Sequence, residues 1–306
     1  MILIKNIKVK EFDEDTRIDR WLKRQFTSLT QNFIEKNLRK GKITVNNKKI
    51  KANYKVIVDD IINIHEYLET KYYSLTKKIN KKILPVLLLK KFKNSIIYQN
   101  SDFIIINKWN GITTQGSSKI EISIDDIIKK LSKHYNLVHR LDKDTSGLLI
   151  IAKNLKATKL FAKLFKEQTI TKIYIALCQG VPKNLNSIVR LEIKNKIHHN
   201  VKTITKYSVI KKRNKISLNL FKPFTGKTHQ IRVISRYLNC PIIGDRKYNS
   251  SIKYILEKLK LNAYYLKFHF NDKKYEFKSI LPTHFLNFMK KNNLYVKFDK
   301  YIYNFL

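Results

Sequence analysis

The chain has 306 residues, enough for about two domains, which excludes a peptide, a disulfide knot or a single mini-domain. Lysine and arginine number 63 against 23 aspartates and glutamates, so the formal net charge is +40 and the expected partner is a polyanion. Hydrophobic residues make up 43% of the chain, which supplies a packed interior and argues against a disordered basic tail.

Part of the lysine excess follows from a general bias, because the chain is also crowded with isoleucine and asparagine. The rest indicates nucleic acid, since neutralising phosphate is a common use of cations on a folded surface. A membrane is not expected as a partner, because the longest aliphatic runs, residues 85–89 and 147–152, are far shorter than the ~20 apolar residues of a spanning helix. The first residues lack the apolar stretch of a secretory signal, so we expect a cytoplasmic protein.

Neither a disulfide nor a metal is expected. Cys178 and Cys240 lie far apart in the sequence and outside any metal-ligand spacing, which is typical of buried thiols in a reducing compartment. The histidines, including the adjacent His198 and His199, have no second thiol or carboxylate at ligand spacing.

The first domain is predicted over residues 1–66 as a small α-α-β unit. Apolar residues at helical spacing predict a helix over 18–26 and a second one over 30–38, with Thr30 as its cap and Gly41 at its end. A tight hairpin over 43–50 and strands at 56–58 and 61–64 are expected to follow.

Three cations, Arg39, Lys40 and Lys42, stand where the second helix meets the hairpin, where they can straddle a phosphate backbone. With Arg17, they belong to segments that resemble the alpha-L RNA-binding module of ribosomal proteins and RNA-modifying enzymes. An ordinary helix-hairpin unit with a solvated basic edge stays the alternative. The resemblance covers residues 17–64 and is carried by Arg17–Leu22, Leu38–Asn46 and Asp59–Ile64.

A lysine-rich linker is predicted over residues 67–94, because its aliphatic residues show little period. Residues 95–306 form the second predicted domain, with many strand-like runs, few helices and no regular β-α alternation. That pattern predicts an α+β domain with a mixed, mainly antiparallel sheet. Strands are expected near 103–106, 148–152, 173–178, 203–210 and 216–221, and helices near 124–131 and 157–165.

The segment His139–Gly147 is the clearest candidate for chemistry, a polar loop between two apolar runs. Asp142 lies in it beside Arg140 and Lys143, and neighbouring cations favour the ionised carboxylate that a nucleophile or base requires. On these residues alone, a charged turn that hydrogen-bonds its own backbone is an equal alternative.

The string His-Arg-Leu-Asp-x-Asp-Thr-Ser-Gly resembles the signature of the RluA-type pseudouridine synthases, and the layout is similar to the RluC/RluD branch that acts on large-subunit ribosomal RNA. Residues 38–50, Gln115 and Gly116 are closer to the RluC type. Trp109, Lys227 and Asn262 depart from the usual pattern without removing a catalytic group. Further motifs at similar spacing are Ile106–Gly111, Lys172–Ala176, Pro223–Arg232 and Pro241–Tyr248.

The resemblance implies that uridine is isomerised to pseudouridine without a cofactor, with the target base flipped out of its stack. It makes Asp142 the catalytic carboxylate, pairs Arg232 with it bidentately, and stacks Tyr174 on the uracil, where its phenol helps to remove the proton from carbon 5. By residue pattern alone, a core aromatic is the favoured interpretation of Tyr174 and a surface cation that of Arg232. Residues implied to contact the substrate or RNA are Arg140, His139, Thr145, Lys172, Lys227 and His229, with Arg17, Arg39, Lys40 and Lys42.

The favoured hypothesis is therefore a monomeric ribosomal RNA pseudouridine synthase whose partner is large-subunit ribosomal RNA or a pre-ribosomal particle. A non-catalytic RNA-binding assembly factor on the same fold is one alternative. A synthase that acts on transfer RNA is the other.

Overall fold

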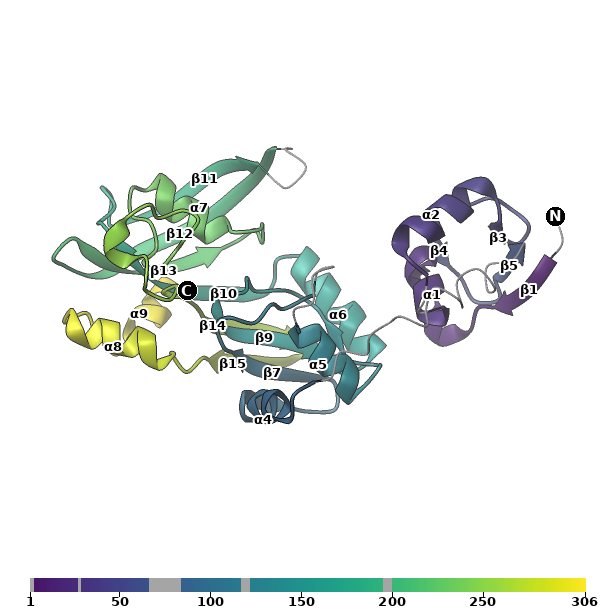
Figure 1. Cartoon of the computed structure of the whole chain (residues 1–306), viewed down its shortest axis with the longest axis horizontal. Coiled ribbons are helices and arrows are strands. Elements are labelled where there is room, and N and C mark those ends of the chain that lie inside the picture. Colours follow the sequence, from purple (N-terminus) through teal and green to yellow (C-terminus); the bar gives the residue numbers. More distant parts are fainter. Residues whose placement is uncertain (1–2, 27–28, 66–83, 117–121, 195–199) are drawn as a thin grey trace. The chain divides into compact units, whose positions relative to one another are not determined.

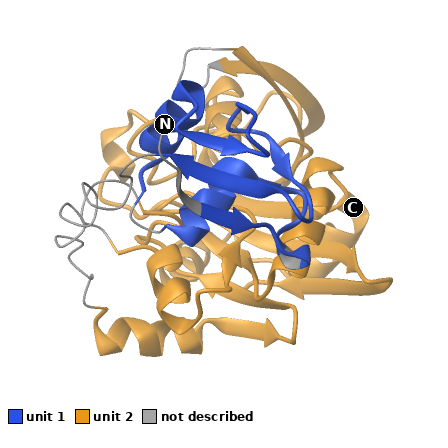
Figure 2. Ribbon diagram, turned by 90° about the vertical axis from the view of Figure 1, so that its right-hand side faces the viewer, with its two compact units in different colours: residues 1–81 blue, residues 82–306 orange. Residues whose placement is uncertain are grey.

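The computed structural model describes residues 3–26, 29–65, 84–116, 122–194 and 200–306. The chain divides into two compact units, residues 1–81 and 82–306 (Figure 2). Most of the predicted linker lies outside the described residues. Its last part forms helix α4 (Val86–Asn94), and Phe92 is fully buried in the core of the second unit. These nine residues are therefore part of the second unit.

The two predicted helices of the first unit are confirmed. The Thr30 hydroxyl accepts a hydrogen bond from the Phe33 amide at 3.3 Å, and Gly41 ends the second helix with φ +71°. Trp21 and Ile34 bring both helices into one core. The elements are β1 (Leu3–Lys8), a 3-10 turn η1 (Glu11–Asp13), β2 (Thr16–Arg17), α1 (Ile18–Gln25), α2 (Gln31–Lys40), β3 (Ile43–Val45), β4 (Lys55–Val56) and β5 (Ile61–His65).

The predicted hairpin over 43–50 is confirmed only at its turn, because no second strand follows it within these described residues. Asn46 and Asn47 do form a tight turn with positive φ, but it closes only one bridge, between Val45 and Lys48. β3 pairs instead with β5, and β1, which the sequence analysis did not predict, pairs with the other edge of β5. Burial of Ile62 on β5 against the helices fixes this arrangement.

The second unit is built on one large sheet, and the α+β prediction with mainly antiparallel pairing is confirmed (Figure 1). Its strand order is β11-β12-β13-β10-β14-β9-β7-β6, with β15 beside β14 and β8 beside β9. Only β9 and β14 pair in parallel among the described strands. The strands are β6 (Ile96–Gln99), β7 (Phe103–Lys108), β8 (Asn136–Leu137), β9 (Ser146–Ala152), β10 (Thr171–Gln179), β11 (Asn186–Lys194), β12 (Asn200–Arg213), β13 (Ile216–Pro223), β14 (Leu261–Phe270) and β15 (Lys273–Lys278).

Helices cover both faces of this sheet. On β7 and β9, alternate residues face either α5 or α6, as expected for strands buried on both sides. On β10, one set of alternate residues packs on α8 and α9, and the other set packs on α7. Every helix in the described ranges is too short or too polar to cross a membrane. The helices are α5 (Ile124–Leu131), α6 (Leu155–Lys166), α7 (Gln230–Tyr237), η2 (Ile252–Tyr254), α8 (Thr283–Lys291) and α9 (Phe298–Phe305).

The parallel junction between β9 and β14 lies directly after the Asp142 loop. It consists of Ser146 opposite Asn262 and Gly147 opposite Ala263. The side-chain amide of Asn262 donates a hydrogen bond to the Ser146 hydroxyl at 2.8 Å, which links the two strands. Gly147 has φ +113°, and a Cβ there would lie 2.3 Å from the Ala263 carbonyl oxygen. Only glycine allows this close approach.

We therefore expect Gly147→Ala to destabilise the protein by at least about 2 kcal/mol, because both the backbone angle and the contact with β14 must change. Gly226 is the matched control, since a Cβ there meets open space and its φ is not positive. Gly226→Ala should change the free energy of unfolding by less than about 1 kcal/mol. Urea unfolding of both variants tests this, and equal effects would contradict it.

Candidate active site

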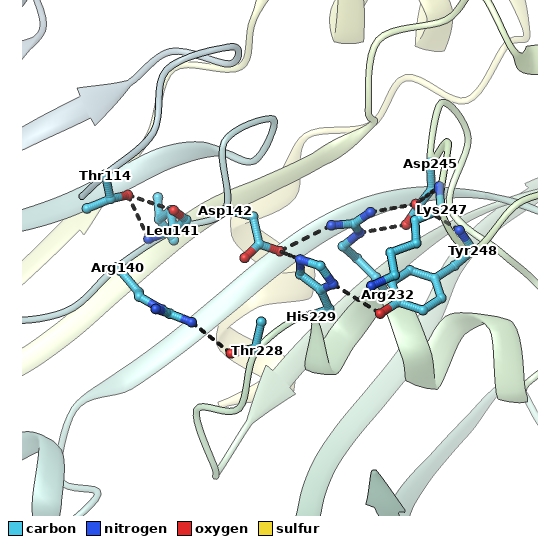
Figure 3. A network of polar contacts seen from close by, with 10 residues as sticks. All are labelled: Thr114, Arg140, Leu141, Asp142, Thr228, His229, Arg232, Asp245, Lys247 and Tyr248. Carbon is cyan, nitrogen blue, oxygen red and sulfur yellow. Dashed lines mark hydrogen bonds and ion pairs between the residues drawn. The ribbon is translucent and has the colours of Figure 1, made fainter. Parts of the chain in front are cut away.

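Asp142 lies in the loop between β8 and β9, and short hydrogen bonds hold this loop in place (Figure 3). The Thr145 amide donates to the Asp142 carbonyl at 3.1 Å and closes a turn. The Thr114 hydroxyl binds both backbone groups of Leu141, the residue before Asp142. It accepts from the Leu141 amide at 3.0 Å and donates to the Leu141 carbonyl at 2.6 Å. The backbone that carries the Asp142 carboxylate is thus fixed on both sides.

A buried lysine supports the same loop from β7. The Lys108 ammonium donates to the carbonyls of Trp109, Ile112 and Lys143 at 3.0–3.1 Å, and the residue is fully buried. Burial lowers the pKa of Lys108 to about 7, against the opposing charges of Asp144 and Asp142. Lys108 therefore joins the end of β7 to the Asp142 loop.

The loop before α7 is organised by Gln230, which is buried. Its side-chain amide donates to the Thr205 hydroxyl at 2.8 Å, and its oxygen accepts from the Thr225 hydroxyl and the Lys227 amide at 2.8 and 3.0 Å. His229 follows this loop with φ +57°, an uncommon angle for histidine. The start of α7 is thereby held in one conformation.

The bidentate partner of Arg232 is Asp245, and the predicted bidentate pair with Asp142 is wrong. Arg232 Nε and Nη2 each lie 2.7 Å from an Asp245 oxygen, whereas Nη1 lies 3.5 Å from Asp142 Oδ2 (Figure 3). The Asp245 side chain is fully buried and also accepts from the Lys247 and Tyr248 amides. Burial alone would raise the pKa of Asp245, but the hydrogen bonds and charge of Arg232 outweigh it and lower that pKa.

His229 faces the same oxygen of Asp142 as Arg232 does. Its Nε2 is 3.7 Å from Asp142 Oδ2, and its Nδ1 is 3.0 Å from the Tyr248 hydroxyl. Burial is the main cause that lowers the pKa of His229; the charge of Asp142 opposes it, and the charges of Arg232 and Lys247 act in the same direction as burial. The imidazole is therefore neutral at neutral pH.

One pocket joins these groups. Tyr174 reaches it from β10, where burial raises the pKa of its phenol and keeps the group neutral. The exposed Arg140 lies at the same pocket, and its guanidinium donates to the Thr228 hydroxyl at 2.7 Å. The pocket is lined by Arg140, Leu141, Asp142, Thr145, Tyr174, Pro223, Thr225, Gly226, Lys227, Thr228, His229, Gln230, Ile231, Arg232 and Leu261.

Two predicted substrate contacts, His139 and Lys172, do not line this pocket. His139 Nε2 accepts a hydrogen bond from the Ile150 amide at 2.9 Å, and its ring lies 4.9 Å from the ring of Phe165. The Lys172 ammonium lies 5.7 Å from the same Phe165 ring. His139 therefore supports the strand after the Asp142 loop.

Stability should depend on His139 at acid pH. Burial, with the charge of Lys172, lowers the pKa of His139 to about 3, below its usual 6.5. As the pH falls, the unfolded chain binds a proton at this histidine before the folded protein does. The stabilisation that neutral His139 gives the folded protein is therefore present above pH 6.5 and is lost as the pH falls toward 3. His139→Gln keeps an acceptor for the Ile150 amide without a titrating group. Urea unfolding at pH 7 and pH 4 should show a smaller loss in His139→Gln than in the wild type, and parallel losses would contradict this.

The predicted RNA contacts of the first unit lie in varied settings. Arg39 and Lys40 are exposed on the last turn of α2, and Lys42 follows half-buried. Arg17 is paired with Asp19, with Nη2 2.7 Å from its carboxylate. Arg39 and Lys40 are thus the more accessible cations of this set.

The sequence analysis gave no role to four residues that support the site: Asp245, Tyr248, Thr114 and Lys108. Asp245 and Tyr248 belong to a motif quoted there, but no local signal indicated their contacts with Arg232 and His229. Among the described residues, no group of three or more histidine, cysteine, aspartate or glutamate side chains is placed to hold a metal ion. His198 and His199 lie outside the described residues.

Comparison with known proteins agrees with this site. Residues 102–236 match the family described as RNA pseudouridylate synthase, and residues 16–62 match the S4 domain. The Rickettsia bellii protein named ribosomal large subunit pseudouridine synthase C is 36% identical, over 84% of this chain and 88% of that protein. The Rickettsia prowazekii protein of the same name is 38% identical, over 88% of this chain and 95% of that protein.

A solved structure has the same fold. Human RNA pseudouridylate synthase domain containing 4 superposes with a TM-score of 0.61 at 25% identity, covering 69% of this chain and 97% of that one. The family match over residues 102–236 includes Asp142, Tyr174 and Arg232. The chain belongs to the RNA pseudouridylate synthase family, with an S4 domain before its synthase unit.

Proposed function

We propose that this protein isomerises uridine to pseudouridine in large-subunit ribosomal RNA, with Asp142 as the catalytic carboxylate. The observation that carries the proposal is the pocket in which the Asp142 carboxylate meets the Arg232 guanidinium at 3.5 Å. The curated relatives named for the large ribosomal subunit support this RNA as the substrate.

The reaction involves no net oxidation or reduction, because the product is an isomer of the substrate, and the proposal includes no cofactor. The bond from carbon 1 of the ribose to nitrogen 1 of the uracil breaks, and a bond to carbon 5 forms. The proton on carbon 5 leaves, and nitrogen 1 gains one. Asp142 supplies the carboxylate at the glycosidic bond, and the permanently charged guanidinium of Arg232 lies 3.5 Å from it.

Tyr174 and Arg140 receive the flipped base. Tyr174 presents an aromatic ring to the pocket, and such a ring can stack on uracil. Its phenol stays neutral, which supports the stacking role over a role as an ionised base. Arg140 lies at the exposed side of the pocket, where a guanidinium can fill the gap in the stack or hold a phosphate.

RNA binding should be strongly electrostatic, since the chain carries a net charge of +40. We expect the affinity for large-subunit ribosomal RNA to fall at least about 100-fold between 50 and 200 mM salt, because counterions are released from the phosphates on binding. Filter binding over a salt series measures this. A salt-independent affinity would contradict the electrostatic part of the proposal.

The substrate is tested with separate unmodified transcripts of large-subunit ribosomal RNA, small-subunit ribosomal RNA and transfer RNA. Each is incubated with the full-length protein and digested to nucleosides, and pseudouridine is quantified by chromatography. We expect pseudouridine in the large-subunit transcript alone. Product only in transfer RNA would identify the other substrate class, and binding without product in any RNA would favour an assembly factor.

A further inference from the structure

Two donors converge on the same oxygen of Asp142. Arg232 Nη1 lies 3.5 Å and His229 Nε2 lies 3.7 Å from Oδ2, and no hydrogen bond or ion pair from a described residue reaches Oδ1 (Figure 3). The two oxygens therefore differ: Oδ2 faces the protein, and Oδ1 is left for the substrate.

The His229 ring is itself held. Tyr248 OH lies 3.0 Å from His229 Nδ1, and the two rings are nearly perpendicular at a centroid distance of 5.6 Å. When the phenol donates to Nδ1, the ring proton is on Nε2 and points toward the Asp142 carboxylate. The left-handed backbone at His229 further restricts where the ring can lie.

One short turn controls both donors. Asp245 holds Arg232, and three residues later Tyr248 holds His229. The Tyr248 amide donates to Asp245 Oδ1 at 3.1 Å, so the two tethers are linked to each other. The turn after α7 thus sets the position of both groups that face Oδ2.

Building on the proposed function, we propose that His229, tethered by Tyr248, is a positioning residue that holds Oδ2 of Asp142 and so presents Oδ1 to the flipped uridine. A distance of 3.7 Å is longer than a hydrogen bond, and catalytic contacts often tighten only when substrate binds. A shift of less than ~1 Å completes the contact.

The His229 ring lies among charged groups, and burial lowers its pKa, so the neutral ring can offer the proton on Nε2 to Asp142. The groups that face the His229 ring are Asp142 from the loop before β9, Arg232 from α7, and Asp245, Lys247 and Tyr248 from the following turn.

Two amide substitutions separate positioning from a merely structural role. In His229→Gln, the side-chain amide nitrogen can take the place of Nε2. In His229→Asn it is too short to reach Asp142, although asparagine tolerates the left-handed backbone and so preserves the fold. We expect kcat on large-subunit ribosomal RNA to fall about 100-fold in His229→Asn with KM nearly unchanged, and much less in His229→Gln.

Tyr248→Phe gives the second readout, because it frees the ring without changing His229. We expect kcat to fall in Tyr248→Phe with KM nearly unchanged, as in His229→Asn. Matched controls are His269→Asn and Tyr237→Phe, since both residues are exposed and neither lines the pocket. Both controls should keep the wild-type rate.

Three outcomes overturn the inference. They are wild-type kinetics in His229→Asn, equal losses in His229→Asn and His229→Gln, and a rise in KM alone, which would assign His229 to RNA binding. In each of these, the wild type still forms pseudouridine and the proposed function stands. A wild type that converts no uridine would overturn both.

Discussion

Asp142→Asn is expected to abolish pseudouridine formation while leaving RNA affinity unchanged. The amide keeps the size of the side chain but cannot carry the negative charge that the proposed reaction requires at the glycosidic bond. The expected loss in rate is on the order of 10⁴-fold, as for other catalytic carboxylates. Single-turnover conversion of a large-subunit transcript measures it, with affinity determined in parallel by filter binding.

Asp144→Asn is the matched control for this variant. Asp144 lies two residues away in the same loop and is exposed, but it does not line the pocket. It should keep a rate within a few-fold of the wild type. Equal losses in the two variants would show that charge in the loop matters, and not Asp142 in particular.

Asp245→Ala is expected to have the largest effect on stability. Asp245 is fully buried and makes the bidentate contact with Arg232, whose side chain is only 13% exposed. Removing one partner leaves the Arg232 charge buried without its main counterion, at a cost of about 3–5 kcal/mol. The rate should also fall, because Arg232 then loses the contact that aims Nη1 at Asp142. Urea unfolding and single-turnover conversion measure the two effects.

An exposed ion pair provides the comparison. Lys8 and Asp59 lie 3.0 Å apart, with side chains 67% and 69% exposed. Lys8→Ala should therefore change the free energy of unfolding by about 1 kcal/mol or less. A similarly small change in Asp245→Ala would contradict a structural role for the buried pair.

Local sequence signals predicted the regular elements well. Thr30 and Gly41 bound α2 because capping depends on a few adjacent residues. The pairing of the strands was harder to predict from local sequence than the strands themselves. The hairpin expected after Ile43 is limited to one bridge, and the main partner of β3 is β5, whose residues lie about twenty positions away. Residues 86–94 were assigned to a linker, although burial of Phe92 and the partial burial of its helical neighbours make them α4.

The same limit applies to the site. The motif around Asp142 was recognisable because its residues are consecutive. The bidentate partner of Arg232 was not recognisable. Whether Asp142 or Asp245 takes that place depends on how the loop before β9 and the turn after α7 meet in space. His139 was expected to contact the substrate or RNA, yet it does not line the pocket, and its Nε2 accepts a hydrogen bond from the Ile150 amide.

The most direct test uses a large-subunit ribosomal RNA transcript in which every uridine carries tritium at carbon 5. Isomerisation must release that hydrogen, whereas binding alone does not. The proposed function predicts that the wild type releases tritium in proportion to the pseudouridine formed, and that Asp142→Asn, bound to the same extent, releases none. Equal release by both proteins, or none by the wild type on bound RNA, would contradict the assignment of Asp142 as the catalytic residue of a ribosomal RNA pseudouridine synthase.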